Sequence, residues 1–259
     1  MSRGMLLALD IGNTNVTVGV FEDARLRRTW RLATDVRREA DEYGGLLLTL
    51  LQHSGIDREQ IGAAVMCSVV PDLDPVFETV CRSYLGVRPL MVEVGVRTGI
   101  RVLYDAPRDV GPDRVADAVA ALHLYGAPVI IVDLGTATVF DAVNRDGDYV
   151  GGAIAPGLGI AAEALFQRAA RLYRVELTRP RAVIGRNTVA AMQSGIVYGY
   201  VALVEGMVAR FKEELGADAK VVATGGYAHL IAAETRAIDH VNPDLTLVGL
   251  RLIYEMNRD

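Results

Sequence analysis

The chain has 259 residues, of which 51% are hydrophobic and 23% charged, and it carries nine prolines and two cysteines. This composition excludes a disordered or collagen-like chain, and the length suits one large domain or two of ordinary size. A net charge of −5 and an isoelectric point near 5.5 provide no basic surplus for nucleic acid or an anionic membrane. We therefore expect neither as a partner.

Cysteine and histidine residues show no spacing typical of a zinc site or a disulfide framework. Cys67 and Cys81 form no CxxC motif, and the four histidines are scattered. No apolar run approaches the roughly 20 residues that span a bilayer. The opening segment reaches Asp10 before it forms a full apolar region or a cleavage site, unlike a signal peptide. These patterns predict a soluble, cytoplasmic protein with reduced thiols.

The first half of the chain reads as three strands followed by alternating helices and strands. An apolar run ends at Gly12, and a β-branched stretch and an alternating stretch follow it. Leucines at i, i+1, i+4 and i+5 predict a helix over Glu39–His53, with Gly55 as its C-terminal cap. The predicted elements in this half lie at about 5–11, 16–21, 26–32, 39–53, 63–70, 71–84 and 90–94.

The second half repeats this order. A helix over 115–125 leads into a buried strand at 129–132, and Asn144–Gly147 is predicted to turn the next strand back on itself. The remaining elements are predicted as strands at 139–143, 148–154 and 221–223, and as helices at 159–172, 188–215, 230–233 and 245–257.

One short pattern occurs at the first hairpin of each half. Asp10–Thr14 and Asp133–Ala137 both follow an apolar strand and share the order Asp, apolar, Gly, polar or small. Internal repetition constrains a fold strongly. We therefore predict two related domains, 1–114 and 115–259, joined by a linker near residues 111–115.

The paired hairpins point to phosphate binding. A carboxylate at the end of a strand can hold hydrated Mg²⁺, and Gly12 lets backbone N–H groups approach a phosphate. One Asp-x-Gly hairpin alone is equally typical of an ordinary turn. Two of them in duplicated halves, with Thr136 and Thr138 in the second, favour a nucleotide held from both sides. No P-loop or protein-kinase glycine loop is present.

Gly111–Arg114 opens a helix at the junction of the halves. Asp113 could simply stabilise the helix dipole, with Arg114 solvated. Alternatively, Asp113 accepts a proton from a substrate hydroxyl while Arg114 binds an anionic group. The position beside the expected cleft favours the second interpretation. Thr224–Gly226 and Gly151–Gly157 are compatible with either tight turns or ligand contacts.

Taken in order, these segments resemble the type III pantothenate kinases of the acetate and sugar kinase/Hsp70/actin superfamily. The resemblance runs essentially end to end. It implies an α/β fold of duplicated ribonuclease H-like (actin-like ATPase) domains, with mixed sheets flanked by helices and an interdomain cleft. It rests on Asp10–Asn15, Ser68–Pro71, Gly111–Arg114, Asp133–Thr138, Gly151–Leu158 and Thr224–Gly226.

The resemblance also implies roles for individual residues. Asp113 is expected to be the proton acceptor, Asp133 to bind a monovalent cation, K⁺ or NH₄⁺, and Thr136 to contact ATP. The expected first ATP-phosphate element comprises Asp10, Ile11, Gly12, Asn13, Thr14, Asn15, Val16 and Thr17. The expected pantothenate contacts are Tyr104, Gly111, Pro112, Asp113, Arg114 and Thr188. Family members resemble one another in being homodimers.

The function predicted from this resemblance is ATP- and Mg²⁺-dependent phosphorylation of pantothenate to 4'-phosphopantothenate, the first step of coenzyme A biosynthesis. Departures from the family pattern are small: Leu134 stands where Phe is common, and Val139 where Thr often follows. Residues 1–4 are expected to be a frayed extension. Two alternatives remain open, namely a kinase of the same fold for another small alcohol, and a nucleotide-binding regulator or chaperone-like ATPase.

Overall fold

The computed structural model describes residues 4–169 and 172–258, which form two compact units. Unit 1 draws on residues 1–99, 106–120 and 246–259, and unit 2 on residues 100–105 and 121–245. Both units are discontinuous in sequence, whereas the predicted domains meet at a single boundary between residues 114 and 115. The position of that domain boundary, like the cleft, stays a prediction.

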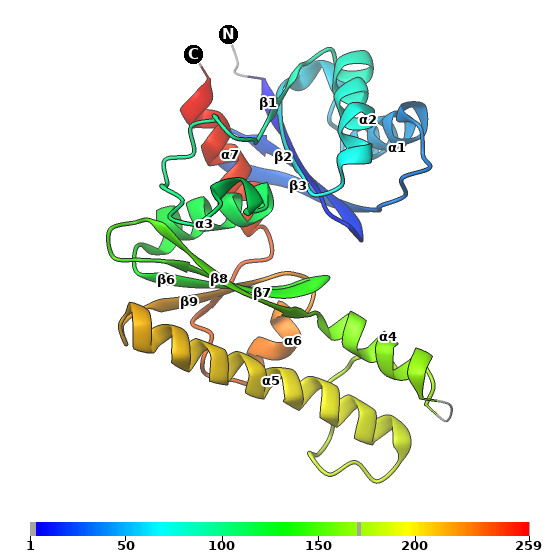
Figure 1. Cartoon of the computed structure of the whole chain (residues 1–259). Coiled ribbons are helices and arrows are strands. Elements are labelled where there is room, and N and C mark those ends of the chain that lie inside the picture. The colour runs from blue at the N-terminus through cyan, green and yellow to red at the C-terminus, as the bar shows by residue number, and fades with distance from the viewer. Residues whose placement is uncertain (1–3, 170–171, 259) are drawn as a thin grey trace. The chain divides into compact units, whose positions relative to one another are not determined.

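The described part of unit 1 is built on a five-stranded mixed sheet of order β3-β2-β1-β4-β5 (Figure 1). β1 runs antiparallel to β2, β2 antiparallel to β3, and β4 parallel to β1 and β5. The bounds are β1 Met5–Ile11, β2 Asn15–Glu22, β3 Arg25–Ala33, β4 Ile61–Ser68 and β5 Pro89–Met91. Three consecutive strands followed by helical crossovers give the parallel pairs.

Alternation along β1 and β2 sorts their side chains between two covered faces. Leu7, Leu9 and Ile11 pack with α1 and α2 in one core, together with Val16 and Val18. The opposite face of the sheet meets helix α7, because a Cβ added to Gly19 would lie 2.8 Å from Leu247. The helical elements on these faces are α1 Ala40–His53, α2 Asp74–Thr79, α3 Pro112–Tyr125 and α7 Leu245–Asn257.

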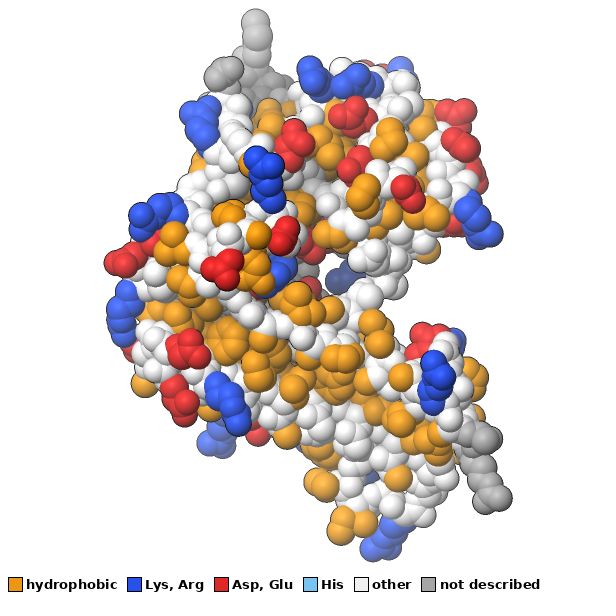
Figure 2. Space-filling view, in the orientation of Figure 1, with side chains coloured by type: hydrophobic (Ala, Val, Ile, Leu, Met, Phe, Trp, Pro, Cys, Tyr) orange, Lys and Arg blue, Asp and Glu red, His pale blue; other side chains and the backbone are white. Residues whose placement is uncertain are grey.

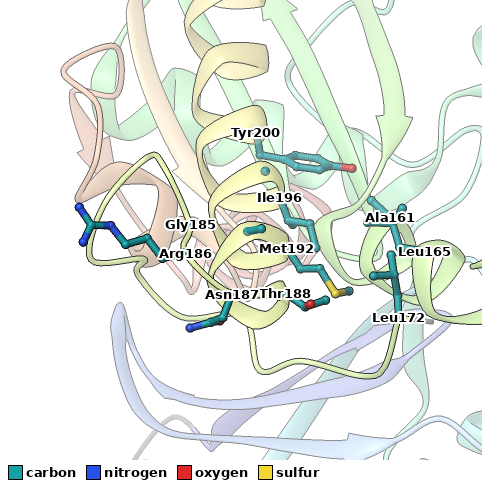
Figure 3. A pocket seen from close by; sticks show the side chains of 12 residues that line it. Ala161, Leu165, Leu172, Gly185, Arg186, Asn187, Thr188, Met192, Ile196 and Tyr200 are labelled. Atoms are coloured by element: carbon teal, nitrogen blue, oxygen red, sulfur yellow. The ribbon is translucent and has the colours of Figure 1, made fainter.

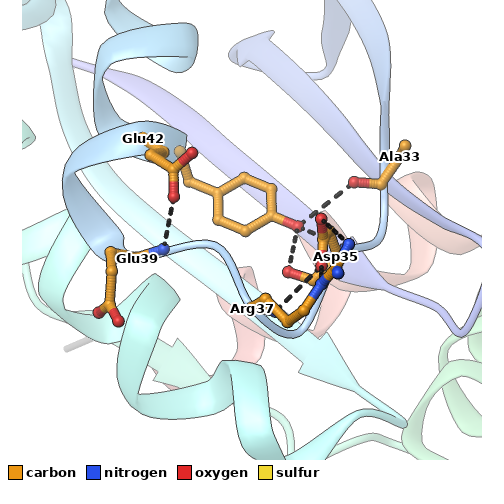
Figure 4. Close-up of polar contacts among 6 residues, drawn as sticks. Ala33, Asp35, Arg37, Glu39 and Glu42 are labelled. Atoms are coloured by element: carbon orange, nitrogen blue, oxygen red, sulfur yellow. Dashed lines mark hydrogen bonds and ion pairs between the residues drawn. The ribbon is translucent and has the colours of Figure 1, made fainter.

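A polar cluster fixes the start of α1 (Figure 4). The backbone N–H of Glu39 donates to the Glu42 carboxylate at 3.0 Å, within a capping box. The hydroxyl of the buried Tyr43 accepts the N–H of Asp35 at 2.9 Å and donates to the carbonyl of Ala33 at 3.3 Å. These bonds tie the helix to the end of β3.

The described part of unit 2 carries a second five-stranded mixed sheet, of order β10-β9-β6-β7-β8. Helices α4, α5 and α6 cover the face formed by Ile130, Val132 and Phe140, where the long helix α5 contributes Val201 and Val204. The bounds are β6 Val129–Leu134, β7 Ala137–Val143, β8 Tyr149–Pro156, α4 Leu158–Arg168, α5 Thr188–Leu215, β9 Lys220–Thr224, α6 Ala228–Ala232 and β10 His240–Val241.

Several predicted elements are confirmed and several differ. Helix α5 has its predicted bounds, and the Asn144–Gly147 turn is present, with Gly147 at φ 81°. The helix predicted over 71–84 is instead a 3-10 turn, the short α2 and a π-helical turn at Val80–Tyr84. The helix predicted from residue 115 begins at Pro112, a residue that favours the first helical turn. The two-residue strand β10 was not predicted.

Two predictions fall partly on residues outside those that the structure describes. The helix predicted over 159–172 ends at Arg168, and residues 170–171 lie outside the described residues. Of the extension expected to fray, residues 1–3 also lie outside them. Gly4, however, lies close to Gly62. A Cβ added to Gly4 would lie only 2.7 Å from the Gly62 Cα. The expectation of fraying is therefore wrong at residue 4.

The expected α/β class, with two mixed sheets flanked by helices, is confirmed. On the face shown in Figure 2, hydrophobic side chains gather over α4 and α5, and many of the charged side chains lie over the other elements. Over the described residues, none of the helices combines the length and apolar character that crossing a bilayer requires.

Candidate active site

Four side chains lie in register across the unit 1 sheet where β1 ends. Asp10 of β1 pairs with Thr17 of β2 and with Cys67 of β4, and Thr17 pairs with Arg31 of β3. Because residues directly opposite one another share a face of the sheet, all four belong to the same face. We call Arg31, Thr17, Asp10 and Cys67 the Asp10 row. Figure 1 shows the three strands β1, β2 and β3 side by side.

Asp10 is the carboxyl of this row, and its pKa is strongly shifted. Burial, and next the negative charge of Asp113, raise its pKa to about 7. The thiol of Cys67, which donates to Asp10 Oδ1 at 3.6 Å, and the charge of Arg31 act in the opposite direction. Burial likewise raises the pKa of the Cys67 thiol well above its usual range. Two carboxyls and a neutral thiol therefore lie close enough to interact in one partly buried place.

Asp113 enters this site from the first turn of α3. An added Cβ on Gly111 would lie 2.4 Å from Asp113 Oδ1, so glycine at this position leaves room for the carboxylate as it is placed here. Burial raises the pKa of Asp113, while the backbone N–H of Arg114, which donates at 2.9 Å, and the Arg114 charge lower it. A partly exposed carboxylate with a raised pKa is suited to general base catalysis.

The hairpin after Asp10 is tightly pinned. The N–H of Gly12 donates to the carbonyl of Asn15 at 3.0 Å, and the hydroxyl of Thr34 donates to the carbonyl of Gly12 at 2.6 Å. The N–H of Thr34 also donates to the carbonyl of Thr14 at 3.1 Å. Asn13, Thr14 and Asn15 themselves are exposed, so their polar groups are presented to solvent from a fixed turn.

The second Asp hairpin, in unit 2, is surrounded by glycines. Asp133 is the penultimate residue of β6. An added Cβ would lie 3.2 Å from its Oδ1 at Gly135 and 2.3 Å from it at Gly225. Gly225 follows Thr224, the register partner of Asp133 on β9, and has a φ of 89°. The loop after β9 therefore lies directly against the Asp133 carboxylate, in a conformation that favours glycine.

Two further residues predicted to contact ligands, Thr136 and Tyr104, also belong to unit 2. Thr136 is part of this hairpin, and Tyr104 lies against the same sheet. Thr136, at the exposed tip, is approached by Gly157, where an added Cβ would lie 2.2 Å from the Thr136 carbonyl oxygen. Gly157 is the N-cap of α4. Tyr104 lies against Gly151 of β8, with 3.5 Å from an added Cβ to its ring. The structure thus assembles Asp133, Gly135, Thr136, Gly157 and Gly225 in one region.

Thr188 lies elsewhere in unit 2, at the N-terminus of α5. Here a groove of about 920 Å³ separates α4 from α5. Side chains of α4 and the segment after it face those of α5 across this groove (Figure 3). Asn187 caps α5 by accepting the N–H of Ala190 at 2.9 Å. The groove is lined by Ala161, Leu165, Leu172, Gly185, Arg186, Asn187, Thr188, Ala191, Met192, Gly195, Ile196 and Tyr200.

The predicted site residues therefore fall into three groups. Unit 1 holds the Asp10–Thr17 element and Gly111–Arg114, unit 2 holds Asp133 and Thr136, and Thr188 lines the separate groove. The predictions missed Cys67 and Arg31 of the Asp10 row. The strand alternation through Thr17 would have placed Arg31 on the face of Asp10, had the register been counted.

Comparisons with known proteins bear on this arrangement. Residues 6–210 match the family model of type III pantothenate kinase. A type III pantothenate kinase of Roseiflexus sp. (strain RS-1) is 55% identical over 254 residues, which cover 98% of this chain and 100% of that protein.

Two solved structures share the fold at low sequence identity. A conserved putative Baf family transcriptional activator from Campylobacter jejuni has a TM-score of 0.62 and 18% identity, covering 97% of this chain and 98% of that one. An inorganic polyphosphate/ATP-glucomannokinase from Arthrobacter sp. strain KM has a TM-score of 0.51 and 14% identity, covering 98% and 100%. The chain itself belongs to the type III pantothenate kinase family, and the predicted activity, ATP-dependent phosphorylation of pantothenate in coenzyme A biosynthesis, is confirmed.

Proposed function

We propose that Asp113 is the general base of this reaction and that the Asp10–Thr17 element holds the phosphates of ATP. The observation that carries the proposal is the pairing of two perturbed carboxyls, Asp10 and Asp113, beside a pinned hairpin with exposed polar groups. Asp113 accepts the proton of the pantothenate hydroxyl as the hydroxyl oxygen attacks the γ-phosphorus in line, the bond from that phosphorus to the β,γ-bridging oxygen breaks, and ADP leaves. Catalysis then consists mainly of positioning and charge neutralisation.

The residues around Asp10 fit a hydrated Mg²⁺. Burial and the charge of Asp113 raise the pKa of Asp10, and burial raises the pKa of Asp113. A cation would stabilise both carboxylates, and Mg²⁺ needs only one or two carboxylates besides phosphates and water. Asp10 would hold the ion, directly or through water. When bound, Mg²⁺ supplies charge neutralisation for the terminal phosphates. Gly12 and the exposed Thr14 and Asn15 contribute backbone and side-chain donors toward the same groups.

Asp133 is our proposed site for the activating monovalent cation, K⁺ or NH₄⁺. The observation that supports it is the close approach of backbone to the carboxylate at Gly135 and Gly225, where an added Cβ would lie 3.2 Å and 2.3 Å from Asp133 Oδ1. A carboxylate among backbone groups is an oxygen-rich environment suited to a hard cation. Thr136 is proposed as the second ATP contact on the same hairpin.

The pantothenate contacts are proposed as Gly111, Pro112, Asp113 and Arg114, with Tyr104 and Thr188. Arg114 is suited to the substrate carboxylate, because a guanidinium can bind it with two hydrogen bonds. The groove beside Thr188 supports the proposal of a homodimer, since it leaves an apolar lining on α4 and α5 uncovered. Family membership further supports a cytoplasmic location and no nucleic-acid or membrane partner.

Mass detection of 4'-phosphopantothenate tests the activity directly. We expect the product after incubation with ATP, Mg²⁺ and K⁺, and less of it when Na⁺ replaces K⁺. A panel of other small alcohols, with ATP consumption as the readout, is the control for substrate class. Phosphorylation of a sugar but not of pantothenate would contradict the proposal. Turnover that is equal in K⁺ and Na⁺ would remove the cation role from Asp133.

A further inference from the structure

The Asp10 row contains a cation that the predicted ATP-phosphate element lacks. Asp10–Thr17 includes no lysine or arginine, and both Asp10 and Asp113 add negative charge where the phosphates of ATP are expected. Phosphoryl transfer depends on neutralising the charge of the terminal phosphate. Some positive group on the protein should therefore complement Mg²⁺ at this place.

Arg31 has the position for this role. It is exposed, and its register partner is Thr17, the last residue of the hairpin element. Thr17 in turn pairs with Asp10, so two strand spacings, about 10 Å, separate the backbones of Arg31 and Asp10. The long side chain lies on the face of Asp10, and its charge acts on that carboxyl.

The neighbouring residues of β3 are directed differently. Arg28 pairs with Val20, and Trp30 pairs with Val18, both on the face of the hydrophobic core. On the other face, the side chain of Leu26 is near Gly19 and Leu247, under α7. Arg31 is therefore the arginine that β3 aligns with the hairpin.

We propose that Arg31 binds the terminal phosphate of ATP and stabilises its charge during transfer. This inference rests on the proposed function, in which the adjoining hairpin holds the ATP phosphates. A guanidinium suits this task because it stays charged and its planar set of donors matches phosphate oxygens. The carboxylate of pantothenate is the other anion in the reaction. Arg31 is assigned to phosphate because Thr17, its partner, belongs to the ATP element.

The experiment compares Arg31→Gln with Arg28→Gln, a matched change on the same strand and the opposite face. For Arg31→Gln we expect kcat/KM for ATP to fall by roughly 10²-fold or more, with KM for pantothenate changed less than about threefold. Arg28→Gln should stay within about twofold. Arg31→Lys, which keeps the charge but not the planar donors, should recover part of the loss and also provides a folded variant if the glutamine variant unfolds.

Binding measurements by calorimetry separate this inference from the proposed function. A non-hydrolysable ATP analogue should lose at least tenfold in affinity for Arg31→Gln, whereas ADP should lose less than threefold. These assays need no acceptor, so they remain decisive if the wild-type chain fails to phosphorylate pantothenate. Unchanged analogue affinity, equal loss for analogue and ADP, or a selective rise in KM for pantothenate would each overturn the assignment.

Discussion

The two Asp hairpins occupy matching places in the two sheets but are surrounded differently. Asp10 has charged and polarisable neighbours, namely Cys67, Asp113 and Arg31. Asp133 has glycines, and the backbone of the loop after β9 lies against its carboxylate. The same strand–Asp–Gly pattern therefore supports two kinds of site. The unit 1 hairpin is built for charge and proton chemistry, and the unit 2 hairpin for close backbone approach.

The largest effect should come from replacing Asp113, the proposed general base in unit 1. Asp113→Asn removes the proton acceptor but keeps the shape of the side chain, so kcat should fall by about 10²–10⁴-fold. ATP affinity should be retained within a few fold, because the proposed role of Asp113 is toward the hydroxyl substrate and not toward ATP. Stopped-time product assays and ATP calorimetry on the same preparation check both statements. Normal turnover by Asp113→Asn would contradict the assignment of the general base to this unit.

A second substitution tests the glycine-lined site. Gly225→Ala introduces a methyl group 2.3 Å from the Asp133 carboxylate and forces alanine into a φ of 89°. The strain and the clash together should destabilise the protein by about 2–5 kcal/mol. Gly226→Ala is the matched control, because an added Cβ there meets nothing within 4 Å. Urea unfolding of the two variants side by side measures the difference, and equal midpoints would contradict the close approach.

The smallest effect concerns the pH dependence of stability. The pKa of Asp10 rises from about 3.9 in the unfolded chain to about 7 in the ligand-free fold. The folded state thus binds the extra proton, and stability from this group is full below about pH 4 and lost as pH rises through 7. Asp10→Asn should therefore stabilise the ligand-free protein at pH 8 by roughly 1–3 kcal/mol, with no gain near pH 4.

Denaturant unfolding at a series of pH values measures this slope. Asp72→Asn, at an exposed position of the same unit, controls for the loss of a charge. If the free energy of unfolding of the wild type does not change between pH 4 and 8, the fold does not raise the pKa of Asp10. A gain in stability for Asp10→Asn that is equal at pH 4 and pH 8 would lead to the same conclusion.

Local patterns in the sequence were enough to predict most of the fold. The apolar run before Gly12 and the β-branched stretch after it located β1 and β2, and the spacing of leucines located α1. The errors lie where packing overrides local preference, as in the π-helical turn at Val80–Tyr84. The two-residue β10 has too little length for a periodic signal.

The candidate site was predictable in its motifs but not in its assembly. Asp10 and Asp113 were recognised separately, each within a recognisable turn. Their coupling depends on where α3 begins relative to β1, and a single sequence does not encode that distance in any local pattern. The same holds for Arg31 and Cys67, which join the site through strand register.

Helix α7 packs on the first sheet although it follows every other described element in the sequence. Leu247 fills the space over Gly19, Gly249 packs against Ala116 of α3, and the Arg251 guanidinium lies 5.8 Å from the centre of the Phe21 ring. During synthesis, the N-terminal strands therefore emerge from the ribosome well before the segment that covers them. Until α7 has been synthesised, one apolar face of the sheet stays exposed to water. During that time chaperones can bind the chain, or it can associate incorrectly with other chains.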